Sequence, residues 1–160
     1  MILIAYDGSD DAKAAIEQAS RLFPGETVTV LTVWQRFLDT MARAGSGLSI
    51  AFDYDEIDGE TEKGTREKAE EGARLAAEAG LDATARTAVV ETTVADAILA
   101  EAAAVEASAV VCGSRGYNGL KGLMLGSTSH HVLQHADIPV VVVPSPAVAR
   151  ARAEHRESLK

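Results

Sequence analysis

The stretch Gly113-Ser-Arg-Gly-Tyr-Asn-Gly-Leu-Lys-Gly-Leu-Met-Leu-Gly-Ser-Thr-Ser129 decides how this chain is interpreted. It follows the apolar run 109–112, which predicts a buried strand, and it precedes residues 129–136, whose apolar side chains recur at helical spacing. Glycines let the main chain approach an anion closely and adopt positive φ angles. The unpaired amides and the dipole of a helix start favour negative charge. A strand, a glycine-rich loop and a helix start with three hydroxyl residues therefore predict a phosphate-binding loop. The alternative is a flexible connection whose glycines only make turns.

The spacing of the glycines separates this loop from the common phosphate-binding motifs. Gly113 is followed by two residues, Gly116, nine residues and then Gly126-Ser127. The chain contains no G-x-x-x-x-G-K-[ST] P-loop, and no G-x-G-x-x-G follows the first predicted strand. The loop is therefore neither a P-loop nor a dinucleotide-binding fingerprint.

Apolar, β-branched runs alternate with helical patterns along the whole chain. The runs predict strands at residues 2–6, 28–34, 82–90, 108–113 and 138–143. Helical patterns occupy residues 10–22, 55–78, 92–106 and 127–136, and residues 35–44 have room for a helical turn. This alternation predicts an α/β fold, an open, doubly wound, five-stranded parallel sheet with helices on both faces, of the Rossmann-like kind. Ligands bind such sheets beyond the carboxyl ends of the strands, where the winding reverses.

Composition limits the classes of function. A chain of 160 residues corresponds to one domain, and its formal net charge of −9 argues against binding to nucleic acid or to anionic membranes. The first residues lack a basic n-region and a cleavage site, and no apolar run approaches the ~18 residues that span a bilayer. These features predict a cytoplasmic protein. Cys112, the single cysteine, lies inside an apolar run and is expected to be a buried small hydrophobe.

Several motifs together carry a resemblance to a known family. They are Ala5-Tyr-Asp-Gly-Ser9 after the first run, the Gly113–Ser129 spacing, Val132-Leu-Gln-His-Ala136 and the closing run Ile138-Pro-Val-Val-Val-Val143. Over residues 1–144 the chain resembles the ATP-binding branch of the universal stress protein family, whose fold is also described as adenine nucleotide alpha-hydrolase-like. Two positions depart from the family pattern, because a frequent glycine is here Glu91 and a frequent proline is here Thr93.

The resemblance implies ATP, with Mg2+, bound across the carboxyl edge of the sheet. By carry-over the adenine and ribose would lie near Ala5, Asp7 and Val33, with Cys112 and Gly113 beside the ribose and with the phosphates at Gly116, Gly126, Ser127, Thr128 and Ser129. Arg115 and Lys121 either supply positive charge to the phosphates or are solvated loop cations. Asp7 either contacts the ligand or caps the first helix.

Other chemistries are weighed against this site. Six carboxylates between Asp53 and Glu62 suggest either a solvated helix start or a metal site, although no calcium-loop spacing is present. A Ser127–His130 or Ser127–His131 catalytic pair lacks the G-x-S-x-G elbow, and a zinc site from Cys112 and the histidines matches no known spacing. No catalytic residue and no metal-ligating residue is therefore assigned.

The resulting function prediction is an ATP-binding regulatory protein of the stress response, whose nucleotide occupancy modulates its conformation or partner binding. It is not expected to be an enzyme beyond slow ATP hydrolysis. The alternatives are a slow ATPase or phosphotransferase, and a ligand-independent homodimeric module. A homodimer is expected through Val140 to Val143. Residues 1–146 would form the universal stress protein domain and residues 147–160 a charged tail, either a surface helix or a frayed end.

Overall fold

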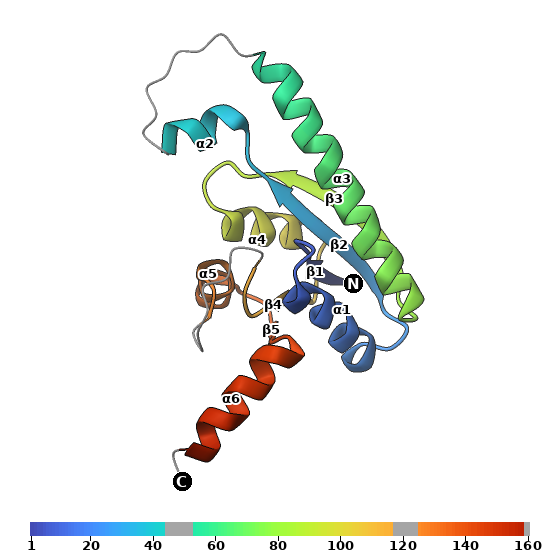
Figure 1. The fold of residues 1–160 in the computed structure, drawn as a ribbon. Coiled ribbons are helices and arrows are strands. Elements are labelled where there is room, and N and C mark those ends of the chain that lie inside the picture. Colours follow the sequence, from blue (N-terminus) through green and yellow to red (C-terminus); the bar gives the residue numbers. More distant parts are fainter. Residues whose placement is uncertain (44–52, 117–124, 159–160) are drawn as a thin grey trace.

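Five parallel strands form a single sheet in the computed structural model, which describes residues 1–43, 53–116 and 125–158. The strands are β1 (Ile2–Ala5), β2 (Thr27–Trp34), β3 (Asp82–Val89), β4 (Ala109–Gly113) and β5 (Val140–Val143). Their order is β3-β2-β1-β4-β5, so the winding reverses between β1 and β4 (Figure 1). The predicted five-stranded, doubly wound α/β fold is confirmed.

Helices cover both faces of this sheet. The described helices are α1 (Asp10–Leu22), α2 (Phe37–Arg43), α3 (Tyr54–Glu78), α4 (Val94–Ala104), α5 (Ser127–His135) and α6 (Pro146–Ser158). Helices α1 and α3 lie on one face, and α4 and α5 on the other (Figure 1). Each strand connects to the next through a helix because neighbouring parallel strands need a crossover.

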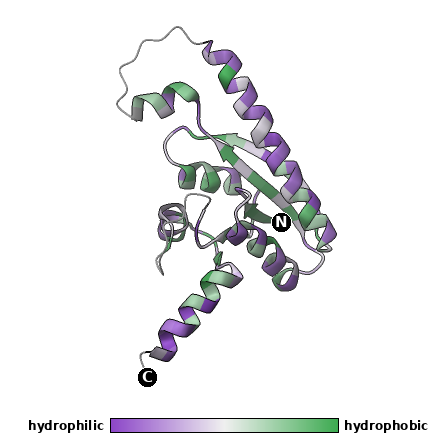
Figure 2. Ribbon diagram, in the orientation of Figure 1, coloured by the Kyte–Doolittle hydropathy of each residue, from purple (hydrophilic) through white to green (hydrophobic). Residues whose placement is uncertain are grey.

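The alternation of side chains along the strands builds two cores. Ile2 and Ile4 of β1 pack with α1 and α3 in the first core, whereas Leu3 packs with α4 and α5 in the second. Successive side chains of a strand point to opposite faces, so a strand buried on both faces is apolar throughout. In Figure 2 green accordingly dominates the ribbon of β1 and much of β2, whereas the ribbon of α3 is mostly purple.

Helix α3 packs on the sheet through its C-terminal half. Its buried residues are Thr65, Ala69, Gly72 and Ala76, one or two per turn. A Cβ atom on Gly72 would lie 2.7 Å from Cδ1 of Tyr6 and 2.8 Å from Cγ1 of Val30, so glycine allows this close approach. Alanines and a glycine at helical spacing predict a closely packed inward face for α3 that includes Ala77, but Ala77 is exposed because it lies on the outer side of the helix.

The surface ion pairs of α3 differ from those predicted by helical spacing. Arg66 pairs with Glu62 rather than with Glu70, and Arg74 pairs with Glu78 rather than with Glu70. Each arginine has carboxylates one turn away in both directions along the helix. Exposed ion pairs one turn before and one turn after each arginine differ little in free energy, so helical spacing alone does not predict which pair forms.

The C-terminal tail forms a helix, one of the two alternatives that the sequence leaves open. Helix α6 begins at Pro146, a favourable first position, and the Ser145 hydroxyl accepts a long hydrogen bond of 3.5 Å from the Val148 amide. Val148 is buried, and beyond it α6 projects away from the sheet (Figure 1). Among the helices that the structure describes, none is both long enough and apolar enough to cross a membrane.

Candidate functional site

Three segments that are distant in the sequence meet at the carboxyl edge of the sheet, where the winding reverses. They are the turn after β1, the turn after β4 and the start of α5. A Cβ atom on Gly116 would lie 2.7 Å from Oδ2 of Asp7, so these two predicted site residues are in direct proximity. Gly126 lies beside the turn after β4, because its amide donates a 2.8 Å hydrogen bond to the Ser114 carbonyl. The structure therefore brings Asp7, Gly116 and Gly126 to one place.

The turn after β1 positions the Asp7 carboxylate. Gly8 has a φ of +83°, a conformation that side chains rarely adopt, and this allows the chain to turn sharply into α1. Asp7 Oδ1 accepts a 3.0 Å hydrogen bond from the Ser9 amide, and the Ser9 hydroxyl caps α1 by accepting from the Ala12 amide at 3.2 Å. The N-cap of α1 is therefore Ser9, and Asp7 supports the turn while its second oxygen faces Gly116.

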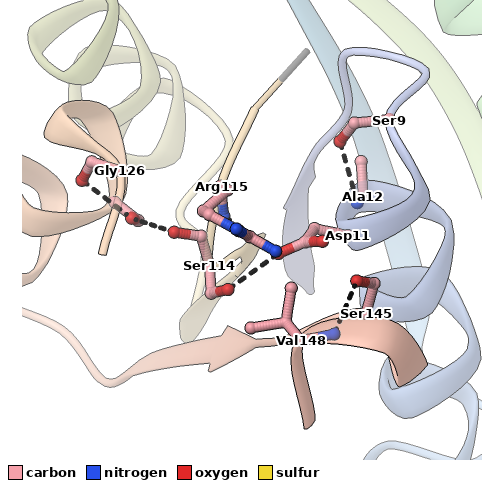
Figure 3. A network of polar contacts seen from close by, with 9 residues as sticks. Ser9, Asp11, Ala12, Ser114, Arg115, Gly126, Ser145 and Val148 are labelled. Atoms are coloured by element: carbon pink, nitrogen blue, oxygen red, sulfur yellow. Dashed lines mark hydrogen bonds and ion pairs between the residues drawn. The ribbon is translucent and has the colours of Figure 1, made fainter. Parts of the chain in front are cut away.

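A buried polar network holds the turn after β4 against α1 (Figure 3). Asp11 Oδ2 accepts a 2.7 Å hydrogen bond from the Ser114 hydroxyl and a 3.1 Å bond from the Arg115 amide. Asp11 is only 6% exposed and Ser114 is fully buried. A Cβ atom on Gly113 would lie 2.8 Å from Cβ of Asp11, so Gly113 allows the helix to come this close to the strand end.

Sequence patterns alone do not predict the roles of Asp11 and Ser114. Asp11 is one of two adjacent aspartates at the start of a predicted helix, where a carboxylate ordinarily faces solvent and favours the helix dipole. The two residues are 103 positions apart, and only the packing of α1 against β4 brings them together. The only local indication is that Ser114 is a small polar residue inside the glycine-rich loop.

The start of α5 has the donors that an anionic group requires. Gly126 is the N-cap, with an extended backbone and no side-chain hydrogen bond to the first turn. The first intrahelical bond runs from the His130 amide to the Gly126 carbonyl, so helix geometry leaves the amides of Ser127, Thr128 and Ser129 without partners inside the helix. Such a helix start can bind a phosphate group, so these residues fit the predicted ligand.

The hydroxyl residues at the start of α5 have different surroundings. Ser127 is exposed and Thr128 is partly exposed, whereas Ser129 is buried. The Ser129 hydroxyl donates toward the carbonyls of Ser114 and Gly126, each at 3.0 Å. Ser129 thus ties α5 to the turn after β4, and its amide is the group that remains for a ligand.

The residues predicted for the adenine and ribose lie on the face covered by α4 and α5. Ala5 and Cys112 are register partners on the adjacent strands β1 and β4, and Val33 lies near the end of β2. Ala5 and Val33 are partly exposed and pack against the second core. Cys112 is buried, which raises the pKa of its thiol to about 11. These side chains give an apolar strip beside the three converging segments.

The cations predicted for the phosphates are only partly described. The Arg115 guanidinium lies toward α1, with Nε 4.0 Å from Asp11 Oδ2, and its side chain is 21% exposed (Figure 3). Lys121 lies outside the described residues. Positive charge at this edge is therefore contributed by Arg115 together with the partial charge of the α5 start.

Of the α5 histidines, His131 contacts α4 rather than the phosphate-binding segments. His131 Nε2 lies 3.5 Å from Asp96 Oδ1, and the rings of His131 and His135 are 4.2 Å apart. Hydrogen bonds from the hydroxyls of Thr92 and Thr93, together with the nearby imidazoles, hold the pKa of Asp96 below its ordinary value. Thr93 caps α4, because its hydroxyl accepts from the Asp96 amide at 3.1 Å, as the three-residue spacing of Thr93 and Asp96 predicts.

Comparisons with known proteins agree with this architecture. The model of the universal stress protein family matches residues 1–144. Universal stress protein YxiE of Bacillus subtilis (strain 168) is 33% identical over 145 residues, which cover 89% of this chain and 97% of the relative.

Several solved structures, including the following three, have similar folds. Hypothetical protein MJ0577 has a TM-score of 0.69 at 21% identity, over 89% of this chain and 94% of that chain. A universal stress protein in complex with cAMP has a TM-score of 0.61 at 21% identity, over 90% and 96%. The universal stress protein from Archaeoglobus fulgidus in complex with dAMP has a TM-score of 0.54 at 22% identity, over 89% and 95%. At these identities the likeness concerns the fold alone.

The sequence motifs and the fold agree with the match over residues 1–144 and with the 33% identity to YxiE. On these grounds, the chain belongs to the universal stress protein family.

Proposed function

We propose that this protein binds an adenine nucleotide at the carboxyl edge of its sheet. One observation carries the proposal: Asp7, Gly116 and the uncapped start of α5 converge where the winding of the sheet reverses. This is the position at which doubly wound sheets bind ligands. Two structures with the same fold hold cAMP and dAMP, which share an adenine and one phosphate. These complexes support an adenine nucleotide as the class of ligand.

The residues of this chain would divide the nucleotide between them. The amides of Ser127, Thr128 and Ser129, beside Gly126, would hold phosphate oxygens, and the absence of a side chain at Gly116 lets Asp7 Oδ2 lie directly against this turn. Ala5, Val33 and Cys112 would contact the adenine and ribose, with Asp7 as the polar anchor. We propose ATP with Mg2+ as the physiological form; the metal would neutralise charge between phosphate oxygens.

The consequence of binding is proposed to be regulatory, as part of a stress response, rather than catalytic. Val33 lies four residues before α2, and α2 contacts the N-terminal part of α3. The Phe37 amide donates a 2.7 Å hydrogen bond to Asp58, and the Phe37 ring stacks on Tyr54 with centroids 6.1 Å apart. A nucleotide beside Val33 would therefore affect how α2 and the start of α3 are presented to a partner.

His131, from one of the two catalytic pairs considered above, and the neighbouring hydroxyl residue Ser129 of α5 already have other contacts. The Ser129 hydroxyl is directed to main-chain carbonyls, and the His131 imidazole pairs with Asp96. Phosphoryl transfer needs a positioned nucleophile and charge neutralisation at the reacting phosphate. These contacts favour binding without rapid turnover.

We also propose a homodimer formed through the last strand. Strand β5 lies at the edge of the sheet, and Val140, Val141 and Val142 are partly exposed. An apolar edge strand is a template for pairing with a second chain. Sedimentation velocity should show a dimer, and a monomer at all accessible concentrations would contradict this assembly.

The nucleotide proposal is tested by calorimetry with ATP, ADP and cAMP, the first two with Mg2+. Gly116→Val and Gly126→Val should abolish binding, because a side chain at either position occupies the space beside Asp7 or Arg115. Gly64→Ala, which adds a methyl group in open space on α3, is the matched control and should bind like the wild type. If the wild type binds none of the three ligands at millimolar concentration, the proposal is wrong.

A further inference from the structure

The buried Asp11 carboxylate is not explained by the fold alone. Buried carboxylates are rare unless they are paired, because removing a charge from water is costly. Asp11 is 6% exposed, yet it is not needed as a cap, because the side chain of Ser9 already caps α1. Its Oδ2 atom instead accepts from the Ser114 hydroxyl and from the Arg115 amide, both in the turn after β4.

Ser114 connects this carboxylate to the start of α5. Its carbonyl accepts a 2.8 Å hydrogen bond from the Gly126 amide and a 3.0 Å bond from the Ser129 hydroxyl. Its own amide donates to the Val143 carbonyl at 2.7 Å. Every polar group of Ser114 thus has a partner, and the partners come from α1, α5 and β5.

These contacts form one continuous chain of hydrogen bonds, from Asp11 through Ser114 to the N-cap of α5 (Figure 3). The far end of the chain is the helix start whose amides are proposed to hold phosphate. A hydrogen bond allows only a narrow range of distances and angles between its two groups. The chain therefore fixes where the α5 amides lie relative to Asp7 and Gly116.

We propose that Asp11 is a positioning residue of the nucleotide site, acting through Ser114 on the start of α5. This inference rests on the proposed nucleotide binding, and it adds a residue that would not contact the nucleotide. Its action depends on hydrogen-bond acceptance rather than on the negative charge, which by itself disfavours a phosphate nearby. An amide oxygen at the same position can accept the same two bonds.

The test compares ATP affinity, with Mg2+, in the wild type and in Asp11→Ala and Asp11→Asn. Titrations are made by calorimetry at a temperature where circular dichroism shows each protein folded. Asp11→Ala should weaken binding about tenfold, the equivalent of about one buried hydrogen bond, whereas Asp11→Asn should stay within about twofold of the wild type. Ile16→Val, which removes a buried methyl group from the same helix, is the control for lost stability and should not change the affinity.

Ser114→Ala keeps the test valid if Asp11→Ala does not fold. Ser114→Ala breaks the same chain of hydrogen bonds and should weaken ATP binding. Where both variants fold, the double variant should bind ATP little more weakly than Asp11→Ala alone, because the two residues act in series. Folded Asp11→Ala or Ser114→Ala protein with wild-type affinity would overturn the inference, as would an equal loss in Asp11→Asn. A wild type that binds no adenine nucleotide would instead refute the proposed function, before any variant is made.

Discussion

Two glycines of α3 have opposite predicted responses to the same substitution. Gly64 and Gly72 both lie inside the helix, where alanine is favoured over glycine by ~1 kcal/mol. A Cβ atom on Gly64 would meet no atom within 4 Å, so Gly64→Ala should stabilise the protein by roughly 0.5–1 kcal/mol. The same atom on Gly72 would lie 2.7 Å from Tyr6 and 2.8 Å from Val30.

The steric cost of Gly72→Ala can be isolated because Gly72→Ala and Gly64→Ala gain the same helix propensity. Inserting a methyl group into a packed core costs about 1–3 kcal/mol. The free energies of unfolding of Gly72→Ala and Gly64→Ala should therefore differ by about 1–3 kcal/mol, with Gly72→Ala the less stable protein. Neither neighbour can move away easily, because Tyr6 and Val30 are both buried.

Urea denaturation measures this difference directly. Circular dichroism follows the helices, and the fluorescence of Trp34, the single tryptophan, follows β2. Coincident transitions would support two-state analysis. Gly59→Ala, also in open space on α3, is a second control that should behave like Gly64→Ala. If Gly72→Ala is stabilised as much as these two variants, α3 does not pack on Tyr6 as described.

Three further predictions concern titration, capping and thiol reactivity. Burial and the hydrogen bond to Glu71 raise the pKa of Tyr6 above its ordinary value of 10.0. The unfolded chain therefore loses this proton first, and the stability that Tyr6 contributes is present below pH 10 and is lost as the pH rises above it. Denaturation at several alkaline pH values should show a steeper decline for the wild type than for Tyr6→Phe; equal slopes would contradict the burial. Thr93→Ala should destabilise the protein by ~1 kcal/mol because it removes the cap of α4, and an unchanged urea midpoint would argue against that cap. The Cys112 thiol, with a pKa of about 11, should react with a disulfide reagent only as fast as the protein opens, so fast labelling of folded protein would disagree with its burial.

The regular elements could be predicted from local patterns. Residues 109–112 form a continuous apolar run and residues 28–34 a nearly continuous, β-branched one, as expected of strands covered on both faces, and both became interior strands of the sheet. Thr93 and Asp96 have capping spacing, and the bond between them is present. Pro139, a residue tolerated at the start of a strand or at a sheet edge, precedes β5, and β5 is an edge strand.

The contacts that shape the site could not be predicted in this way. The Asp11–Ser114 bond depends on how α1 packs on β4, and neither residue has a local pattern that points to the other. The Arg36–Glu91 ion pair joins two turns 55 positions apart, and Glu91 is one of the positions where the chain departs from the family pattern. Long-range polar contacts of this kind follow from the tertiary structure and leave little trace in sequence periodicity.

The central claim is that a nucleotide phosphate binds where the turn after β1, the turn after β4 and the start of α5 meet. Amide chemical shifts of the isotopically labelled protein, recorded by NMR during titration with ATP and Mg2+, test this most directly. The largest shifts should occur at Asp7, Gly116 and residues 127–129, with smaller ones at Ala5 and Val33. Saturating shifts confined to other elements, or no shifts at millimolar ATP, would contradict the claim.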